Sequence, residues 1–460
     1  MAPGRPSPVN QFSNGNGHAT NGHHSRRRRL DQRQSAETQS LPEYLYNAHA
    51  RLAYTGAYGR ELLLLVDANN GDGITYRRFQ VDATVLARNL ETRCGVVAGD
   101  TIAILSESNI DIPIVSVAAW NARATIVILP PDATINEQQA MLVQHLPRVM
   151  CVSQALLART QQLLSVTANA RSVQIVVIDN DGEEHGVAPS TDSGDRAIWS
   201  IQELYMPDPN GPAPVEQQPL SENEAQELTA IIYFTHQPSD GDSLTVVPNI
   251  MSHYEIISLY RNSLRRSPSL PNTRSFVRQA ASTSSRPQTP MARAMPVRPQ
   301  ESNMAALDHT PDIAFAVLRM HRAYRLHRVV FDIFCRGARY LVAHTFDPAQ
   351  FAHLVGQYEL TSAEMTFAEI DRFVSYMQTH TVPRSSSSDS AASGQPEYAI
   401  SSTSSMSLLS PELADMLSTL RFIYTESPRA EPELGLELAR LLPGAHIVRT
   451  RFGSYVELPV

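Results

Sequence analysis

The chain has 460 residues, of which 42% are hydrophobic and 18% charged, and its formal net charge at pH 7 is −8. This length favours roughly two to three domains, and the acidic balance gives no sign of a nucleic-acid partner. No apolar run approaches the roughly 18 residues of a membrane helix and the N-terminus has no apolar signal core, so we expect a cytoplasmic or also nuclear protein without a membrane span.

Lysine is absent from the sequence, so all 38 residues in the combined lysine and arginine count are arginine. A chain of this length ordinarily carries on the order of two dozen lysines. A codon bias against A-rich codons is one explanation, although asparagine and isoleucine remain plentiful. The chemical consequence is that no reaction requiring a lysine ammonium can be carried by this chain.

The three cysteines, Cys94, Cys151 and Cys335, are far apart and have no C-x-x-C spacing. An odd number of dispersed cysteines does not suit a disulfide framework or a zinc site. We therefore interpret them as free buried thiols in a reducing compartment.

Residues 1–40 are rich in Pro, Asn, Gly, His, Ser and Arg and have no apolar period, which predicts a disordered tail. The run Arg26-Arg27-Arg28-Arg29 fits a nuclear import signal or a solvated basic tail equally well.

From residue 41 the apolar pattern becomes regular. Residues 62–66 predict a buried strand, residues 69–73 a hairpin turn, and the apolar spacing over 79–90 an amphipathic helix. Further strands are expected at 101–105, 124–129, 149–152 and 173–178, with helices at 112–120, at 137–146 and near Leu156. This alternation predicts a doubly wound α/β sheet.

Two long polar segments, residues 262–310 and 383–408, are predicted to be disordered. The stretch from Arg261 to Arg298 contains eight arginines and no Asp or Glu. It suits an acidic partner, phosphorylation at Ser267 and Thr289, which precede prolines, or simply a tolerated surface insertion.

Outside these segments the second half again alternates. Helices are expected at 328–334, from Asp347-Pro348 onward and at 433–442, and strands at 340–342, at 420–424 and, as the last strand, at 447–450. We therefore assign residues 41–261 to a first α/β subdomain, and residues 311–382 and 409–460 to a second.

Several of these segments resemble the adenylate-forming superfamily, which includes acyl-CoA synthetases and coumarate-CoA-ligase-like enzymes. The matching text includes Ile74-Thr75-Tyr76 followed by Gly99-Asp100-Thr101, and Phe346-Asp347-Pro348. It continues with LARLLPGAHIV at residues 438–448. The resemblance covers roughly residues 41–460 without the polar segments. It implies an α/β fold, that of the N-terminal domain of these enzymes, with doubly wound mixed sheets and flanking helices.

The strand at 231–234 is expected to end in a polar loop that starts at Thr235 and resembles the family's glycine-rich phosphate loop. Thr235, Ser239 and Gly241 are the vestigial nucleotide-binding candidates. His236 and Ser239 replace glycines whose backbone would approach phosphate, and Asp242 stands where the family has lysine. An acidic side chain would repel a triphosphate.

The other site candidates also come from the resemblance. Phe452 and Gly453 match the last core motif as nucleotide-binding candidates, and Glu457 is the candidate magnesium ligand. His321 is the substrate-pocket candidate, either part of an anion-facing wall with Arg319, Arg322 and Arg325, or part of an exposed basic helix face. The adenine-facing segment is compared with Thr425-Glu426-Ser427-Pro428, where Glu426 is unfavourable beside a purine.

The chain ends ten residues after the last expected strand. We therefore expect it to lack the family's small C-terminal domain, which supplies a catalytic lysine, and no catalytic residue is assigned. One hypothesis is a degenerate, non-catalytic member that acts by binding or scaffolding, with a protein partner held through the disordered arms. The alternatives are an acyl-adenylating ligase that uses a small carboxylic acid, ATP and Mg²⁺ with atypical motifs or a partner-supplied domain, and an incomplete gene product.

Overall fold

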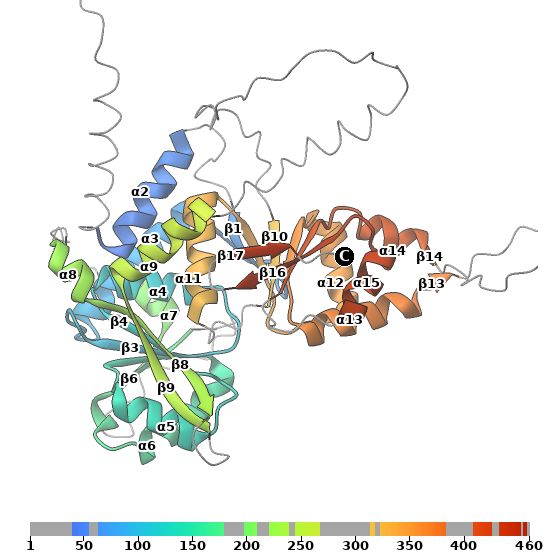
Figure 1. The fold of residues 1–460 in the computed structure, drawn as a ribbon. Coiled ribbons are helices and arrows are strands. Elements are labelled where there is room, and N and C mark those ends of the chain that lie inside the picture. The colour runs from blue at the N-terminus through green and yellow to red at the C-terminus, as the bar shows by residue number, and fades with distance from the viewer. Residues whose placement is uncertain are drawn as a thin grey trace, which may run out of the picture.

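The computed structural model describes residues 39–54, 63–178, 197–208, 220–238, 244–266, 313–317, 323–382, 408–425, 432–451 and 454–457. These residues form two large sheets, with helices between them and on their outer faces, and one small two-stranded sheet (Figure 1). We call the eight-stranded sheet "sheet A" and the seven-stranded sheet "sheet B". In the described part of the chain, no helix is both long and apolar enough to cross a membrane.

Sheet B holds most of the strands predicted in the first half. Its order is β7 (Ile198–Ser200), β6 (Gln174–Val177), β5 (Val149–Val152), β3 (Thr101–Leu105), β4 (Thr125–Ile128), β8 (Thr229–Pro238) and β9 (Leu244–Ser252). All neighbours are parallel except β8 and β9. The central strands are apolar throughout, as expected for parallel strands covered on both faces.

Sheet A combines the beginning of the chain with its second half. Its order is β17 (Ser454–Glu457), β16 (His446–Arg451), β15 (Phe422–Thr425), β12 (Ser362–Glu364), β10 (Ile313–Ala316), β11 (Arg339–Val342), β1 (Leu63–Asp67) and β2 (Gly73–Thr75). The predicted β1–β2 hairpin is confirmed. However, β1 pairs in parallel with β11, so this hairpin lies in sheet A although its sequence neighbours build sheet B.

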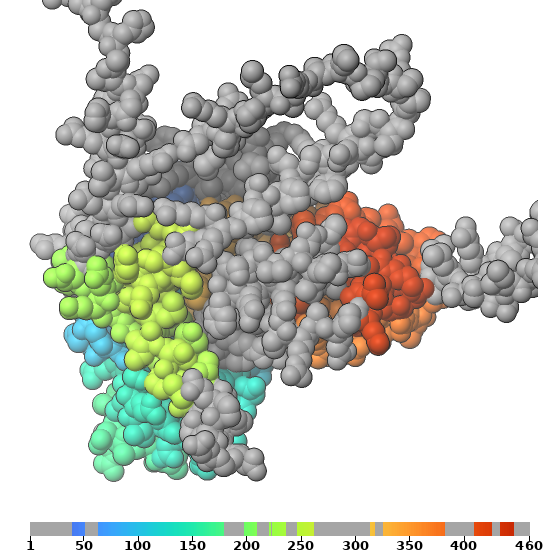
Figure 2. Space-filling model, in the orientation of Figure 1, coloured from blue at the N-terminus to red at the C-terminus, as the bar shows by residue number. Residues whose placement is uncertain are grey.

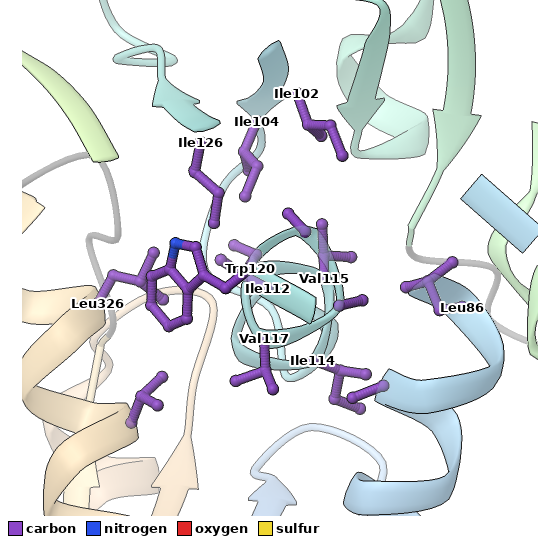
Figure 3. Close-up of a cluster of buried hydrophobic side chains, with 14 of the residues drawn as sticks. Leu86, Ile102, Ile104, Ile112, Ile114, Val115, Val117, Trp120, Ile126 and Leu326 are labelled. Atoms are coloured by element: carbon purple, nitrogen blue, oxygen red, sulfur yellow. The ribbon is translucent and has the colours of Figure 1, made fainter. Parts of the chain in front are cut away.

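Helix α4 (Asp111–Asn121) lies between the two sheets, and all its residues from Ile112 to Trp120 are buried. It contacts Ile102, Ile104 and Ile126 of sheet B on one side, α3 (Tyr76–Thr92) on another, and Leu326 of α11 (Ala323–Phe331) on a third (Figure 3). A helix that is apolar all round is expected to be enclosed by other elements.

The remaining helices cover three faces. The core between the two sheets also contains residues of α2 (Leu41–Tyr54), α7 (Ile201–Tyr205) and α9 (His253–Arg266). The outer face of sheet B is covered by α5 (Ile135–Gln144) and α6 (Leu157–Val166), preceded by the short helix η1 (Gln154–Leu156) and followed by η2 (Ala170–Ser172). The outer face of sheet A is covered by α12 (Pro348–Tyr358), α13 (Phe367–Thr379), α14 (Pro411–Met416) and α15 (Pro432–Leu441). In the space-filling view these two outer layers form the lower and right-hand parts of the molecule (Figure 2).

Local sequence signals set where the helices start. Thr75 caps α3 by accepting from Arg78 N at 3.2 Å, and Asp347 caps α12 ahead of Pro348. Capping boxes open α5 at Thr134 and α13 at Thr366. Such caps satisfy backbone N–H groups that the first helical turn leaves without partners.

Some predictions are corrected. The strand at 447–450 is not the last one, because β17 follows it and pairs antiparallel. Helix α9 extends to Arg266, inside the segment predicted as disordered, whereas residues 267–310 lie outside the described residues. The elements that were not predicted are α2, η2, β7, α7, α8 (Glu222–Glu227), β9, α9, β10, β12, α13, β13 (Thr381–Val382), β14 (Leu408–Leu409), α14 and β17.

The three cysteines are free thiols, as predicted. Cys94 and Cys151 are buried in the core between the sheets, whereas Cys335 is only half-buried. Burial raises the pKa of the Cys94 thiol to about 12, so this thiol is protonated and unreactive near neutral pH.

Candidate functional site

The segment that resembles a phosphate loop lies in the β8–β9 hairpin. Strand β8 does not end at Phe234, because residues 235–238 continue the antiparallel ladder opposite residues 244–247 of β9. The prediction of a loop starting at Thr235 is therefore wrong. The physical reason is that a partner strand satisfies the backbone groups of polar residues as well as those of apolar ones.

Thr235 is the one phosphate-loop candidate that the structure describes. Its side chain is half-buried, and its Oγ1 accepts a hydrogen bond from Asn249 Nδ2 of β9 at 3.0 Å. The hydroxyl is thus held within the hairpin. Ser239 and Gly241 lie outside the described residues.

The carboxyl edge of sheet A is the second candidate region. The strand order of this sheet reverses between β10 and β12, because β10 is followed by β11 on one side and by β12 on the other. Open α/β sheets bind ligands outside the carboxyl ends of their strands at such a switch point. The last residue of β12 at this position is Glu364.

A row of paired residues crosses sheet A at this edge. It comprises Glu457, Val448, Tyr424, Glu364, Ala316, Val342 and Asp67, from β17 to β1. Glu457 therefore has a defined backbone position in the same row as Glu364, although its side chain is outside the described part of the structure.

Arg328 of α11 connects this row to the helices between the sheets. Its Nη1 lies 2.7 Å from Oε1 of Glu364, and its Nε lies 3.4 Å from Oδ2 of Asp332. The guanidinium also lies over the Tyr424 ring, 5.2 Å from the ring centroid. Because Glu364 is almost fully buried, this is a charge-assisted contact in a region of low dielectric.

Asp332 is the other buried carboxylate of this network. It accepts from Tyr260 Oη at 3.2 Å and from Tyr340 Oη at 3.1 Å, and Arg336 Nη1 lies 3.4 Å from it. It begins a π-helical turn, Asp332–Arg336, that ends at Gly337 with a φ of 69°. Such turns are frequent at functional sites.

Arg325 corrects the interpretation of this helix as an exposed basic face. Its side chain is 1% exposed, and its Nη1 donates to the carbonyl oxygen of Val317 at 3.3 Å, at the end of β10. The arginine thus lies inside the molecule beside the carboxyl edge. The candidates His321, Phe452 and Gly453 all lie outside the described residues.

A cavity of about 80 Å³ lies at the far end of the row, beside β1. Asp67, Asp72 and Asp111 line it together with Arg78 and His344, and His344 Nε2 is 3.7 Å from Asp67 Oδ2. Nowhere in the described ranges do three His, Cys, Asp or Glu side chains meet in a way that could hold a metal ion.

The sequence analysis missed the Arg328–Glu364–Asp332 network. One signal was available: residues 362–364 read Ser-Ala-Glu after the helix predicted from Asp347-Pro348 onward, and a charged residue ending a short buried strand is unusual. The strand was too short to be recognised by its apolar pattern.

Comparison with known families finds one match. The model of the family described as "AMP-binding enzyme" matches residues 56–235. A search of curated proteins finds no significant match.

Solved structures with the same fold cover most of the chain. The luciferase-like enzyme of the nonluminescent mealworm Zophobas morio is 15% identical, with a TM-score of 0.58 over 90% of this chain and 72% of that one. A long-chain-fatty-acid-CoA ligase of Archaeoglobus fulgidus is 13% identical, with a TM-score of 0.57 over 90% and 64%. A benzoate CoA ligase of Burkholderia xenovorans is 13% identical, with a TM-score of 0.55 over 90% and 61%.

The present chain thus spans less than two thirds of the two ligases. At these identities the likeness establishes the fold. That fold is the N-terminal α/β domain of the adenylate-forming enzymes, as the sequence resemblance implied.

Proposed function

Given an AMP-binding family region at residues 56–235 on an adenylate-forming fold, we propose that this chain is a degenerate member of the family that binds a ligand or a partner without forming an acyl adenylate. The observation that carries the proposal is the pairing of residues 235–238 with β9. A phosphate loop needs several free backbone N–H groups that converge on one anion. An antiparallel ladder instead spreads these groups along a strand.

The charge of the chain supports the same proposal. Transfer of a nucleotidyl or acyl group requires a positioned cation where negative charge develops. The chain contains no lysine, and its two described arginines nearest the carboxyl edge are already engaged, Arg328 by Glu364 and Arg325 by the Val317 carbonyl.

The binding role has two candidate surfaces. One is the carboxyl edge of sheet A, where Glu364, Arg328 and Tyr424 meet. The other is the arginine-rich stretch from Arg261 to Arg298, whose charge suits an acidic protein partner. A scaffold role would use the second surface, and a ligand-binding role the first.

The alternative is an acyl-adenylating ligase acting on a carboxylic acid with ATP and Mg²⁺, through atypical motifs or a domain supplied by a partner. The specific observation in its favour is the half-buried Arg328, which places a cation at the switch point where such folds bind ligands. Arginine differs from lysine in shape and reach but supplies the same charge.

The deciding experiment is calorimetric titration of the full chain with ATP, with and without Mg²⁺, followed by an assay of pyrophosphate release with a panel of carboxylic acids. We expect no binding at millimolar ATP and no acid-dependent pyrophosphate. Acid-dependent pyrophosphate release from the wild-type chain would promote the ligase alternative.

A restored-loop variant provides the matched comparison. It combines His236→Gly, Gln237→Thr, Pro238→Thr, Ser239→Gly and Asp242→Lys, which returns glycines and a cation to the segment. We expect this variant to bind ATP where the wild type does not. If neither the wild type nor this variant binds ATP, the feature that prevents nucleotide binding lies elsewhere in the chain.

A further inference from the structure

The cavity beside β1 lies between the β1–β2 hairpin of sheet A and the first residues of α3, α4 and α7. Its volume of about 80 Å³ is several times the roughly 10–15 Å³ that one water molecule needs, so a molecule of a few non-hydrogen atoms fits. Glu364, Arg328 and Tyr424 do not line it. The cavity is therefore separate from the ligand surface proposed above.

Asp67 is a buried carboxylate in the wall of this cavity, and one of its oxygens is occupied. It ends β1 and is 7% exposed. Its Oδ1 accepts from the backbone N–H and the side-chain amide of Asn69, at 2.7 and 2.9 Å. Its Oδ2 makes no hydrogen bond within the described part of the chain. A buried carboxylate oxygen without a donor is unfavourable, so a donor from outside the chain would stabilise it.

His344 places a second unpaired polar atom beside this oxygen. Its Nε2 is buried, lacks a hydrogen-bond partner among the described residues, and lies 3.7 Å from Oδ2 of Asp67. That separation exceeds the roughly 2.7–3.2 Å of an N–H···O hydrogen bond. The two atoms therefore do not satisfy each other by a hydrogen bond, but a single atom in the cavity that both residues line can reach both.

The charge of the cavity favours a cation. Three carboxylates line it, those of Asp67, Asp72 and Asp111. The one guanidinium in the lining belongs to Arg78, and its Nε lies 3.2 Å from a further carboxylate, Asp82. The amino ends of α3 and α4 contribute about half a positive elementary charge each, which does not cancel this excess of negative charge.

The geometry of the acceptors selects the kind of cation. No three His, Cys, Asp or Glu side chains of the described ranges are arranged to hold a metal ion, which favours an organic cation. A guanidinium binds a carboxylate best through both oxygens, and Asp67 offers one. An ammonium is a compact charge with three N–H donors and needs no paired oxygens. One donor can reach Asp67 Oδ2 while a second reaches Nε2 of a neutral His344 imidazole.

We propose that this cavity binds a small primary amine in its ammonium form, and that Asp67 Oδ2 and His344 Nε2 accept two of its N–H groups. Asp72 and Asp111 would repel a carboxylate on the same molecule, so the ligand is a simple amine and not an amino acid. The inference goes beyond the proposed function, because it requires neither ATP nor a carboxylic acid. Its failure would leave the non-catalytic assignment in place, and formation of an acyl adenylate would leave this site in place.

The test measures Kd by calorimetry for the full chain with four small probes: propylammonium, propanol, guanidinium and β-alanine. We expect propylammonium to bind at least about tenfold more tightly than the other three, because hydrogen bonds to charged groups contribute that much. An affinity for any of the other three that equals or exceeds that for propylammonium would overturn the proposal. No binding of propylammonium at millimolar concentrations would also overturn it and would mean that solvent alone fills the cavity.

Two variants assign the binding to Asp67. Asp67→Asn keeps an oxygen for Asn69 but presents an N–H donor to the cavity, and we expect the affinity for propylammonium to fall at least about tenfold. Asp371→Asn, at an exposed position of α13, removes the same charge and should leave this affinity unchanged. An unchanged affinity in Asp67→Asn, or an equal loss in both variants, would contradict the proposal. The comparison of the four probes on the wild type decides even if Asp67→Asn does not fold.

Discussion

At the scale of single residues, His253 shows how one buried polar group fixes two distant segments. It is fully buried at the start of α9, and its Nδ1 accepts from the backbone N–H of Leu41 at the start of α2, at 3.0 Å. Burial, helped by the Arg123 guanidinium, lowers the pKa of His253 to about 4. The imidazole is therefore neutral in the folded protein, as its acceptor role requires.

This arrangement predicts a pH dependence of stability. Between pH 6.5 and about 4 the unfolded chain binds a proton at this histidine while the folded chain does not, so stability falls as the pH is lowered through this window. The contribution is up to roughly 3 kcal/mol. We expect His253→Asn, whose amide oxygen can accept from Leu41, to show a weaker decline in urea unfolding between pH 7 and pH 5. His353→Gln, at an exposed position, is the control, and an equal decline in both variants would contradict the assignment.

At the scale of elements, α4 holds the two sheets together. Its residues face β3 and β4 on one side and α3 and α11 on others, so that no side of the helix reaches solvent (Figure 3). The stabilisation comes from apolar area removed from water on every side of the helix.

We expect Ile114→Ala in α4 to lower the free energy of unfolding by about 2–5 kcal/mol, through lost burial and the cavity left behind. Ile114 is 0% exposed. Val143→Ala in α5 removes a smaller group that is 61% exposed and is expected to change stability by less than about 0.5 kcal/mol. Urea denaturation of both variants measures the two losses in free energy of unfolding. If Ile114→Ala lost no more than Val143→Ala, the surroundings of α4 would be collapsing around the cavity.

At the scale of the whole molecule, the parallel pairing of β1 with β11 ties the first part of the chain to the second. Leu65 pairs with Tyr340 and Val66 with Leu341. The core between the sheets likewise mixes residues of α2 and α3 with residues of α11 and of the turn after it. Sheet A thus contains strands from both halves of the chain. Dividing the chain into two halves would therefore not give one complete sheet in each half.

This connectivity predicts that a chain cut between its two halves stays together. A protease site inserted after Arg286 should allow cleavage into two fragments that co-elute as one species in size-exclusion chromatography and separate only in denaturant. Insertion of the site without protease treatment is the control. Two separate peaks in native buffer would show that the β1–β11 pairing does not hold the halves.

The sequence predicted most of the central elements because their signals are local. Continuous apolar runs marked β3, β4, β5 and β6, the spacing of Phe79, Ala83 and Leu86 marked α3, and Asp347-Pro348 marked the start of α12. Short strands such as β12 and edge strands such as β17 carry too few residues for a pattern, so they were missed.

The candidate site was harder to predict. The scarcity of glycine and the absence of lysine after Thr235 are visible in the sequence, but the continued strand pairing of that segment is not. Arg328 and Asp332 lie four residues apart in one continuous helical segment, but Glu364 comes from β12, and no local spacing connects it to them.

The sequence by itself determined the α/β class, the order of most strands and helices and the free thiols, because each depends on neighbouring residue types. Only the tertiary structure decided that the β1–β2 hairpin joins sheet A, that β8 continues through Pro238, and that Glu364 is buried with one oxygen facing no donor in the described residues. These features depend on contacts between segments that are far apart in the sequence. The burial of their combined apolar faces determines which segments make these contacts.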